Sequence, residues 1–408
     1  MNHTQNLFSP EERLYAMYGK NPPVQAVSRL KTERFLLPNI FFSDLDVIME
    51  LQHAAEAAGT DVTAIGFGAS FIAWLFGCTV VNPLPPHRLS PVDNPFVFCY
   101  DGDGWDMPTL IGQNDEVCWD GHEIPIESML GRIRDPNPQL DFRLAESFAD
   151  QAAVIIRNYF RRQDTSLVQF SPGPEGFRGR SFALVPKDAP MFEIAEDGVW
   201  HTGLEEVHSR KYRVVNLIFD ERKEKLRQFR AEPGKAPTMA DLLTEPILAA
   251  TAEKIASEIC ADGGTLLKPD RLCFSSLLQM YGYLHSTYAE DNPVHQLEGV
   301  HYSDVFCYRE QVWALVQSRM DPDYHISSEF AYHVAKMTRS GKFTRNRMDP
   351  ETELTLQGLG ITEQWIQQMK HTCYLPSKAD LISSLLDEME MVWYNLHENS
   401  DSERGELA

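Results

Sequence analysis

The chain has 408 residues, of which 43% are hydrophobic and 24% are charged, and its net charge is -22 at pH 7. This length allows two or three ordinary domains, and the composition is that of a globular protein rather than of a disordered one. Because nucleic-acid-binding proteins gather Lys and Arg against phosphates, a chain this acidic is expected to contact DNA only through a local basic patch.

The cysteines and the N-terminal sequence both indicate a cytoplasmic protein. Seven cysteines are scattered without any C-x-x-C pair, a pattern typical of reduced thiols rather than of a disulfide scaffold or a zinc ribbon. The N-terminal sequence MNHTQNLFSPEERL lacks a basic region followed by an apolar one, so no secretion signal is expected. Residues 64–81 are uncharged and long enough to mimic a membrane span, but their glycines favour a buried core segment over a transmembrane helix.

The first half of the chain is predicted to combine helices and strands. Residues 1–60 are expected to be mostly helical, starting with a helix that Ser9 caps, with Pro10 at its first position and Glu12 three residues after the cap. Residues 83–140 have the Pro, Gly and Asp content of loops and short hairpins. Strands are predicted at 139–144, where apolar and polar residues alternate, and at 177–186 and 211–219, which are rich in apolar and β-branched residues.

Residues 231–238, AEPGKAPT, are the best candidate for a linker, and helices are predicted beyond them. Thr362 is expected to cap one helix, and Ser377, followed by Asp380, to open another. The tail at 398–408 is predicted to be disordered. Both helices carry apolar stripes that are expected in the core, namely Ile361, Trp365 and Met369 in the first and Leu381, Leu385, Met389 and Leu396 in the second.

Short signatures of common enzymes are absent. The sequence has no G-x-x-x-x-G-K-[ST], no G-x-S-x-G and no H-E-x-x-H, and the glycines of AIGFGAS do not complete a dinucleotide-binding pattern. Asp101 and Asp103 resemble the start of a calcium-binding loop, but no Glu follows at the twelfth position. A plain loop is therefore expected there.

A set of phrases in a fixed order resembles a known family. The chain contains YGKNPP, RLKTE, GASFIAWLFGCTVVNPLPPH, DGHEIPIESMLG, a P-x-x-D strand, YSDVFCYREQ, TRSGKF and YLPSKA. In this order they are similar to the polymerase core of bacterial DNA polymerase III alpha subunits of the PolC type, which belong to the C family. VNPLPPH at 81–87 and DGHEIP at 120–125 are the most specific phrases. The resemblance covers residues 15–397, and it extends to the palm and fingers alone.

The resemblance implies a fold and a domain organisation. It predicts an α/β protein with a nucleotidyltransferase-type palm and a mixed sheet at residues 11–230, followed by an α-helical fingers region at 231–397. The zinc ribbon of the PolC family is expected as a degenerate insertion at 88–121, because Cys99 and Cys118 are too few ligands for a structural zinc site.

The same resemblance implies a damaged catalytic site. The family is expected to hold two Mg²⁺ ions on three palm carboxylates, two of them one residue apart on a strand and the third on a neighbouring strand. The family pattern P-D-I-D-L-N-F aligns with residues 138–144. There Gln139 replaces the first acid, Asp141 remains, and Arg143 falls on the same face as Asp141.

The third carboxylate and the phosphate-binding residues are altered as well. Depending on where a gap is placed, the third acid corresponds to Asn216 or Ile218, and Asp220 is the nearby carboxylate that could substitute for it. A Gly-Ser-Arg-Gly-Ser-type run of the family corresponds to DVTAIGFGAS, which has no Arg, and PILAATAEKIASEI at 246–259 replaces an arginine-bearing helix of the fingers. Weak affinity for phosphates is therefore expected.

Two functions follow from the resemblance. The first is a pseudoenzyme that no longer polymerises and acts by binding a replisome protein or primer-template DNA, as a decoy or regulator carried on a phage or mobile element. The second is a residually active nucleotidyltransferase, which would hold Mg²⁺ on Asp141, Asp220 and either Glu221 or Asp135. Apart from that Mg²⁺, no cofactor and no metal site are expected.

A third function, of a different class, is that of a DNA-binding accessory protein. Its surface would combine the basic stretch KMTRSGKFTRNR at 336–347 with FRGRSF at 177–182. The alternative is a solvated basic face that balances a very acidic protein. No membrane partner is expected, and the sequence assigns no oligomeric state. The candidate DNA-binding residues are Lys336, Arg339, Lys342, Arg345, Arg347, Arg178 and Arg180.

Overall fold

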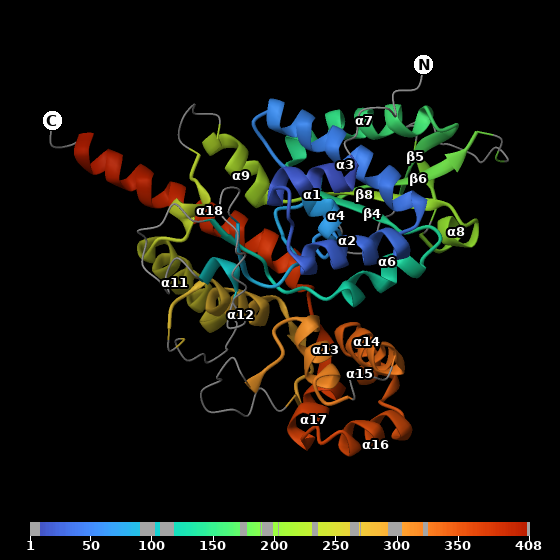
Figure 1. Cartoon of the computed structure of the whole chain (residues 1–408). Helices are drawn as coiled ribbons and strands as arrows, with labels where there is room; N and C mark the ends of the chain where they lie inside the picture. Colours follow the sequence, from blue (N-terminus) through green and yellow to red (C-terminus); the bar gives the residue numbers. More distant parts are fainter. Residues whose placement is uncertain are drawn as a thin grey trace. The chain divides into compact units, whose positions relative to one another are not determined.

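The computed structural model describes residues 9–89, 103–106, 118–171, 178–187, 189, 199–202, 204–230, 236–261, 269, 271–292, 304–320 and 325–405. Within these residues the chain is an α/β protein with a six-stranded mixed sheet, which confirms the predicted α/β class and the mixed sheet (Figure 1). The chain divides into two compact units. The first contains Met1–Leu84 and Met129–Ala236, and the second contains Pro85–Leu89, Pro95–Ser128 and Pro237–Ala408.

The first unit is built on the six-stranded sheet. Its central strands, β4 (Leu140–Leu144) and β8 (Arg213–Phe219), run parallel to each other. The strands at both sides of this pair, β1 (Val62–Ala64) and β6 (Gly179–Pro186), run antiparallel to their central neighbours. The sheet is completed by β5 (Thr165–Ser171) and β7 (Trp200–His201). The strands predicted at 139–144, 177–186 and 211–219 are thus confirmed as β4, β6 and β8.

One face of β4 packs into the core of this unit. Leu140, Phe142 and Leu144 are fully buried, whereas Asp141 and Arg143 between them are partly exposed, as the alternation in the sequence predicts. Helix α7 (Ala149–Arg161) packs against α3 (Asn39–Ala57), where the Tyr159 hydroxyl donates to the Ser43 carbonyl at 2.9 Å. Both helices lie on the same side of the sheet (Figure 1).

The remaining helices of the first unit begin with α1 (Pro10–Tyr18) and α2 (Val24–Leu36). The capping box of Ser9 and Glu12 at α1 is confirmed. The apolar stretch 64–81 contributes the end of β1 and α4 (Phe71–Leu75), in which Phe71, Ile72 and Ala73 are fully buried, so the expected core segment is confirmed. Further along the chain lie α6 (Leu130–Arg134), α8 (Leu204–Ser209) and α9 (Glu221–Arg230). Across the described ranges, no helix combines the length and the apolar character that crossing a bilayer requires.

The second unit is mostly helical, with two small strand pairs. Strands β2 (His87–Leu89) and β3 (Cys118–Asp120) form one pair, and β9 (Thr287–Tyr288) and β10 (Thr372–Tyr374) form the other. A 3-10 turn, η1, covers Gly104–Asp106. The helices are α10 (Met239–Leu242), α11 (Glu245–Ala261), α12 (Phe274–His285), α13 (Arg309–Gln317), α14 (His325–Arg339), α15 (Lys342–Asn346), α16 (Pro350–Gly358), α17 (Glu363–His371) and α18 (Lys378–Gly405).

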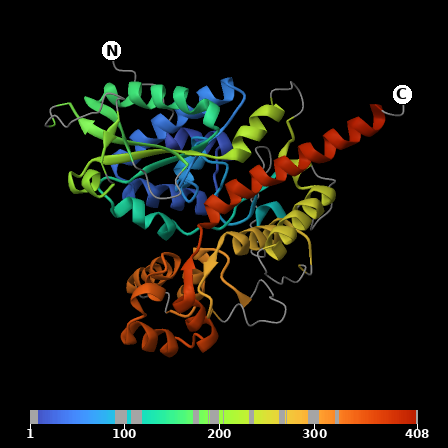
Figure 2. The ribbon, with the colours of Figure 1, turned by 180° about the vertical axis from the view of Figure 1, so that it is seen from behind.

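The helices predicted after Thr362 and Ser377 are present as α17 and α18. Ile361 and Met369 belong to a hydrophobic core shared by helices α13 to α17, and Trp365 packs against it. Leu381, Leu385 and Met389 are buried, but Leu396 is 41% exposed, so its prediction as a core residue is wrong. Figure 2 shows α18 as one long helix beside α11 and α12. It includes residues 398–405, which were expected in a disordered tail.

Candidate functional site

The register of β4 and β8 places Asp141 directly beside Asn216. The side-chain amide of Asn216 donates to Oδ1 of Asp141 at 2.8 Å, and the side-chain amide of Gln139 donates to the same oxygen at 2.6 Å. Gln139 and Asp141 are one residue apart on the strand and therefore share a face. The structure thus brings together these three predicted site residues, one carboxylate and two amides.

The same register distinguishes the two positions that the sequence left open for the third acid. Ile218 is paired with Arg143, not with Asp141. Asn216 is therefore the β8 residue that lies beside Asp141. Asn216 is 8% exposed, whereas Asp141 is partly open to solvent.

Asp220 does not join this cluster. It follows β8, four residues beyond Asn216, which corresponds to about 13 Å along a strand. Its carboxylate lies 3.4 Å from Arg222 and 3.9 Å from Arg143. Burial acts to raise the pKa of Asp220, but Arg222 and Arg143 outweigh it and hold the pKa below its ordinary value. Asp220 is therefore the ion-pair partner of Arg143 rather than a neighbour of Asp141.

The two other acids considered for a metal site have partners of their own. Glu221 pairs with Arg178 at the surface, and the exposed Asp135 accepts from the backbone N–H of Asn137 at 2.9 Å. Over the ranges that the structure describes, no group of three or more His, Cys, Asp or Glu side chains could hold a metal ion.

A buried arginine fixes the start of β4 and with it the position of Gln139. Arg213, at the start of β8, donates through Nε to the Pro138 carbonyl at 2.6 Å and through Nη2 to Asp44 at 2.6 Å. Arg132 adds a hydrogen bond to the Gln139 carbonyl at 2.9 Å. Burial raises the pKa of Asp44 although both arginines oppose this effect. The backbone under the three site residues is therefore held by buried, charge-assisted contacts.

The stretch DVTAIGFGAS, for which a resemblance to a phosphate-binding run was noted above, ends at the start of α4. The Glu33 carboxylate lies at this helix start. Glu33 is fully buried and accepts from the backbone N–H groups of Phe71 at 2.8 Å and Ile72 at 3.0 Å. It also accepts from the Ser70 hydroxyl at 2.8 Å and from Arg29 at 2.7 Å. The backbone N–H groups at the start of α4 thus donate to a carboxylate of the chain itself.

The seven candidate DNA-binding residues differ in their pairing. Arg178 pairs with Glu221, and Arg180 pairs with Asp150. The cations of the stretch 336–347 form no ion pair with any residue that the structure describes. Lys336, Lys342, Arg345 and Arg347 are exposed, and Arg339 is partly buried. Burial, reinforced by the positive charge of Arg309, lowers the pKa of Arg339.

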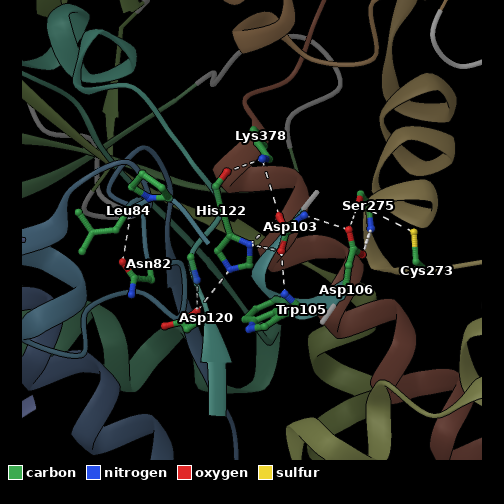
Figure 3. A network of polar contacts seen from close by, with 12 residues as sticks. Asn82, Leu84, Asp103, Trp105, Asp106, Asp120, His122, Cys273, Ser275 and Lys378 are labelled. Carbon is green, nitrogen blue, oxygen red and sulfur yellow. Dashed lines mark hydrogen bonds and ion pairs between the residues drawn. The ribbon is translucent and has the colours of Figure 1, made fainter. Parts of the chain in front are cut away.

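A buried polar network in the second unit was not predicted from the sequence (Figure 3). Nδ1 of His122 lies 2.8 Å from Asp103, and Lys378 contacts both the His122 carbonyl and Asp103. Asp106 accepts from the backbone N–H of Ser275 at 2.8 Å. Because Asp103 and His122 are almost fully buried, we interpret the network as a structural clamp that joins η1, the segment after β3 and the start of α18.

Gly104 is required where η1 packs closely on β3. A Cβ at this position would lie 2.4 Å from the backbone of Asp120, so the 3-10 turn can pack on β3 only with glycine. Asp103 precedes this turn and lies 2.8 Å from Nδ1 of His122, while Asp101 lies outside the described residues. Cys99 and the side chain of Cys118 also lie outside them, and the degenerate zinc ribbon remains a prediction.

Comparison with known proteins gives a distant relationship. No family model matches this chain. It is 22% identical to the DNA polymerase III PolC-type of Thermotoga petrophila, over 95% of this chain and 33% of that protein. It is 32% identical to the PolC-type protein of Lactococcus lactis over 36% of this chain, and 35% identical to that of Streptococcus thermophilus over 24% of this chain. The chain thus spans about a third of the length of the Thermotoga protein and 10% or less of the other two in these matches.

Proposed function

We propose that this chain is a non-polymerising relative of the PolC palm and fingers, and that it acts by binding a replication partner or DNA. The observation that carries the proposal is the pair of amides on Asp141. Gln139 and Asn216 stand where two further carboxylates would be needed, and both donate hydrogen bonds to the acid that remains. Mg²⁺ gives up its hydration reluctantly, so a site with one carboxylate is expected to bind it too weakly for two-metal catalysis.

Primer extension on a primed template, with Mg²⁺ or with Mn²⁺, tests the loss of activity. We expect no incorporation by the natural chain. Measurable incorporation that Asp141→Ala abolishes would contradict the proposal, because it would show that Asp141 still supports nucleotidyl transfer.

A variant with added carboxylates tests whether positions 139, 141 and 216 lie close enough together to form a metal site. Gln139→Asp combined with Asn216→Asp restores three carboxylates at positions that β4 and β8 already bring together. We expect this variant to bind Mn²⁺ in calorimetry, whereas the natural chain and the variant Asp220→Asn bind none. If the natural chain binds Mn²⁺ and loses it on Asp141→Asn, the proposed degeneracy is wrong.

DNA is the favoured partner because the cations of 336–347, unlike Arg178 and Arg180, form no ion pair with a described carboxylate. In an acidic chain, cations kept free of internal carboxylates remain available for phosphates. We define the basic surface as Lys336, Arg339, Lys342, Arg345 and Arg347.

A salt-dependent gel shift tests this second part. If the four exposed cations of the basic surface each contact one phosphate, the logarithm of the binding constant should fall with the logarithm of salt with a slope of about -3 to -4. Lys342→Gln with Arg345→Gln should weaken binding, and the control Arg178→Gln with Arg180→Gln should not. No shift even at low salt would contradict DNA binding and would favour a protein partner.

A further inference from the structure

We infer that the basic surface binds single-stranded rather than duplex nucleic acid, with Tyr374 as the platform on which a base stacks. This inference rests on the proposed DNA binding and deepens it by assigning the form of the ligand. The starting observation is that Tyr374, the last residue of β10, is 50% exposed although it lies beside the end of α14.

Three contacts place β10 against the turn between α14 and α15. The backbone N–H of Leu375 donates to the Arg339 carbonyl at 3.2 Å, and the Thr344 hydroxyl donates to the Thr372 carbonyl at 2.7 Å. At Gly341, where φ is +61°, a Cβ would lie 2.4 Å from the Cys373 carbonyl oxygen. The backbone on both sides of Tyr374 is therefore anchored beside the basic surface.

The cations around Tyr374 are clustered, and without a bound anion their mutual repulsion is unfavourable for the folded protein. The Arg339 guanidinium is partly buried and lies near the side chains of Tyr374 and Tyr332. It also lies near the positive charge of Arg309, which Glu310 offsets in part at 2.9 Å. Lys336 lies 6.0 Å from the centre of the Tyr332 ring. The dipole of α14 favours the two cations in its last turn, but it does not account for Lys342 and Arg345, which belong to α15. An anion bound here would offset the repulsion among these charges.

Exposed aromatic rings among cations are typical of single-strand binding. A base can stack on a tyrosine when it is not already stacked and paired within a duplex, and the neighbouring cations follow the backbone phosphates. A duplex would offer this surface its phosphates alone. The geometry therefore favours a single strand, whose base would use Tyr374 and whose phosphates would use Arg339 and Lys336.

Fluorescence anisotropy with a labelled thymidine homopolymer and with a duplex of the same length tests this inference on the full chain. We expect the single strand to bind at least about 10-fold more tightly than the duplex at low salt. Tyr374→Ala should weaken single-strand binding about 10-fold, while Tyr374→Phe should keep it. The matched control is Tyr15→Ala, since Tyr15 is 52% exposed on α1 and should have no effect.

An abasic single strand, which retains the phosphates without bases, separates stacking from charge. Its affinity should be unchanged by Tyr374→Ala and lowered by Arg339→Gln. If charge variants weaken all ligands equally and Tyr374→Ala weakens none, the stacking platform is wrong and the proposed DNA binding stands. If no nucleic acid binds at all, both are overturned.

Discussion

At the scale of single residues, substitution of Arg213 tests how strongly its buried contacts stabilise the start of β4 and β8. Arg213→Ala would leave the fully buried Asp44 with Arg132 as its remaining charge partner, at 3.6 Å. We expect the free energy of unfolding in urea to fall by about 3 kcal/mol, because removing one partner leaves a buried charge poorly compensated. The control is Arg162→Ala, whose exposed pair with Glu50 should contribute less than about 1 kcal/mol. Equal losses in the two variants would show that Asp44 does not depend on Arg213.

At the scale of elements, the clamp between η1 and the start of α18 predicts a pH dependence. Burial acts to raise the pKa of Asp103, but His122 and Lys378 outweigh it and hold the pKa below its ordinary value. Such a group stabilises the fold above its unfolded pKa of about 3.9, and the contribution is lost as the pH falls through the lower folded value. Between pH 5 and pH 3, the melting temperature should therefore fall more steeply in the natural chain than in Asp103→Asn. Parallel curves would contradict the role of the clamp.

The elements also show what the sequence could and could not predict. The alternation of Leu140, Phe142 and Leu144 with polar residues identifies β4, because a strand exposes every second side chain. The choice between Asn216 and Ile218 depends on the register between two strands far apart in the chain, which no local pattern encodes. Leu396 fails for a related reason, since a helical stripe identifies the buried face but not where its packing partners end.

At the scale of the whole molecule, the question is whether net charge or the position of the cations controls binding. A chain with a net charge of -22 repels nucleic acid as a whole, so binding requires a local surface that outweighs this repulsion at short range. The test variant combines Lys342→Glu with Arg345→Glu. Its control combines Lys20→Glu with Lys31→Glu and makes the same change in net charge. All four of these side chains are exposed. We expect the first variant to lose at least about 10-fold in affinity at low salt and the second to lose less than about 2-fold, with the difference shrinking as salt screens the charges. Equal losses would mean that net charge, rather than the surface between α14 and α15, governs the interaction.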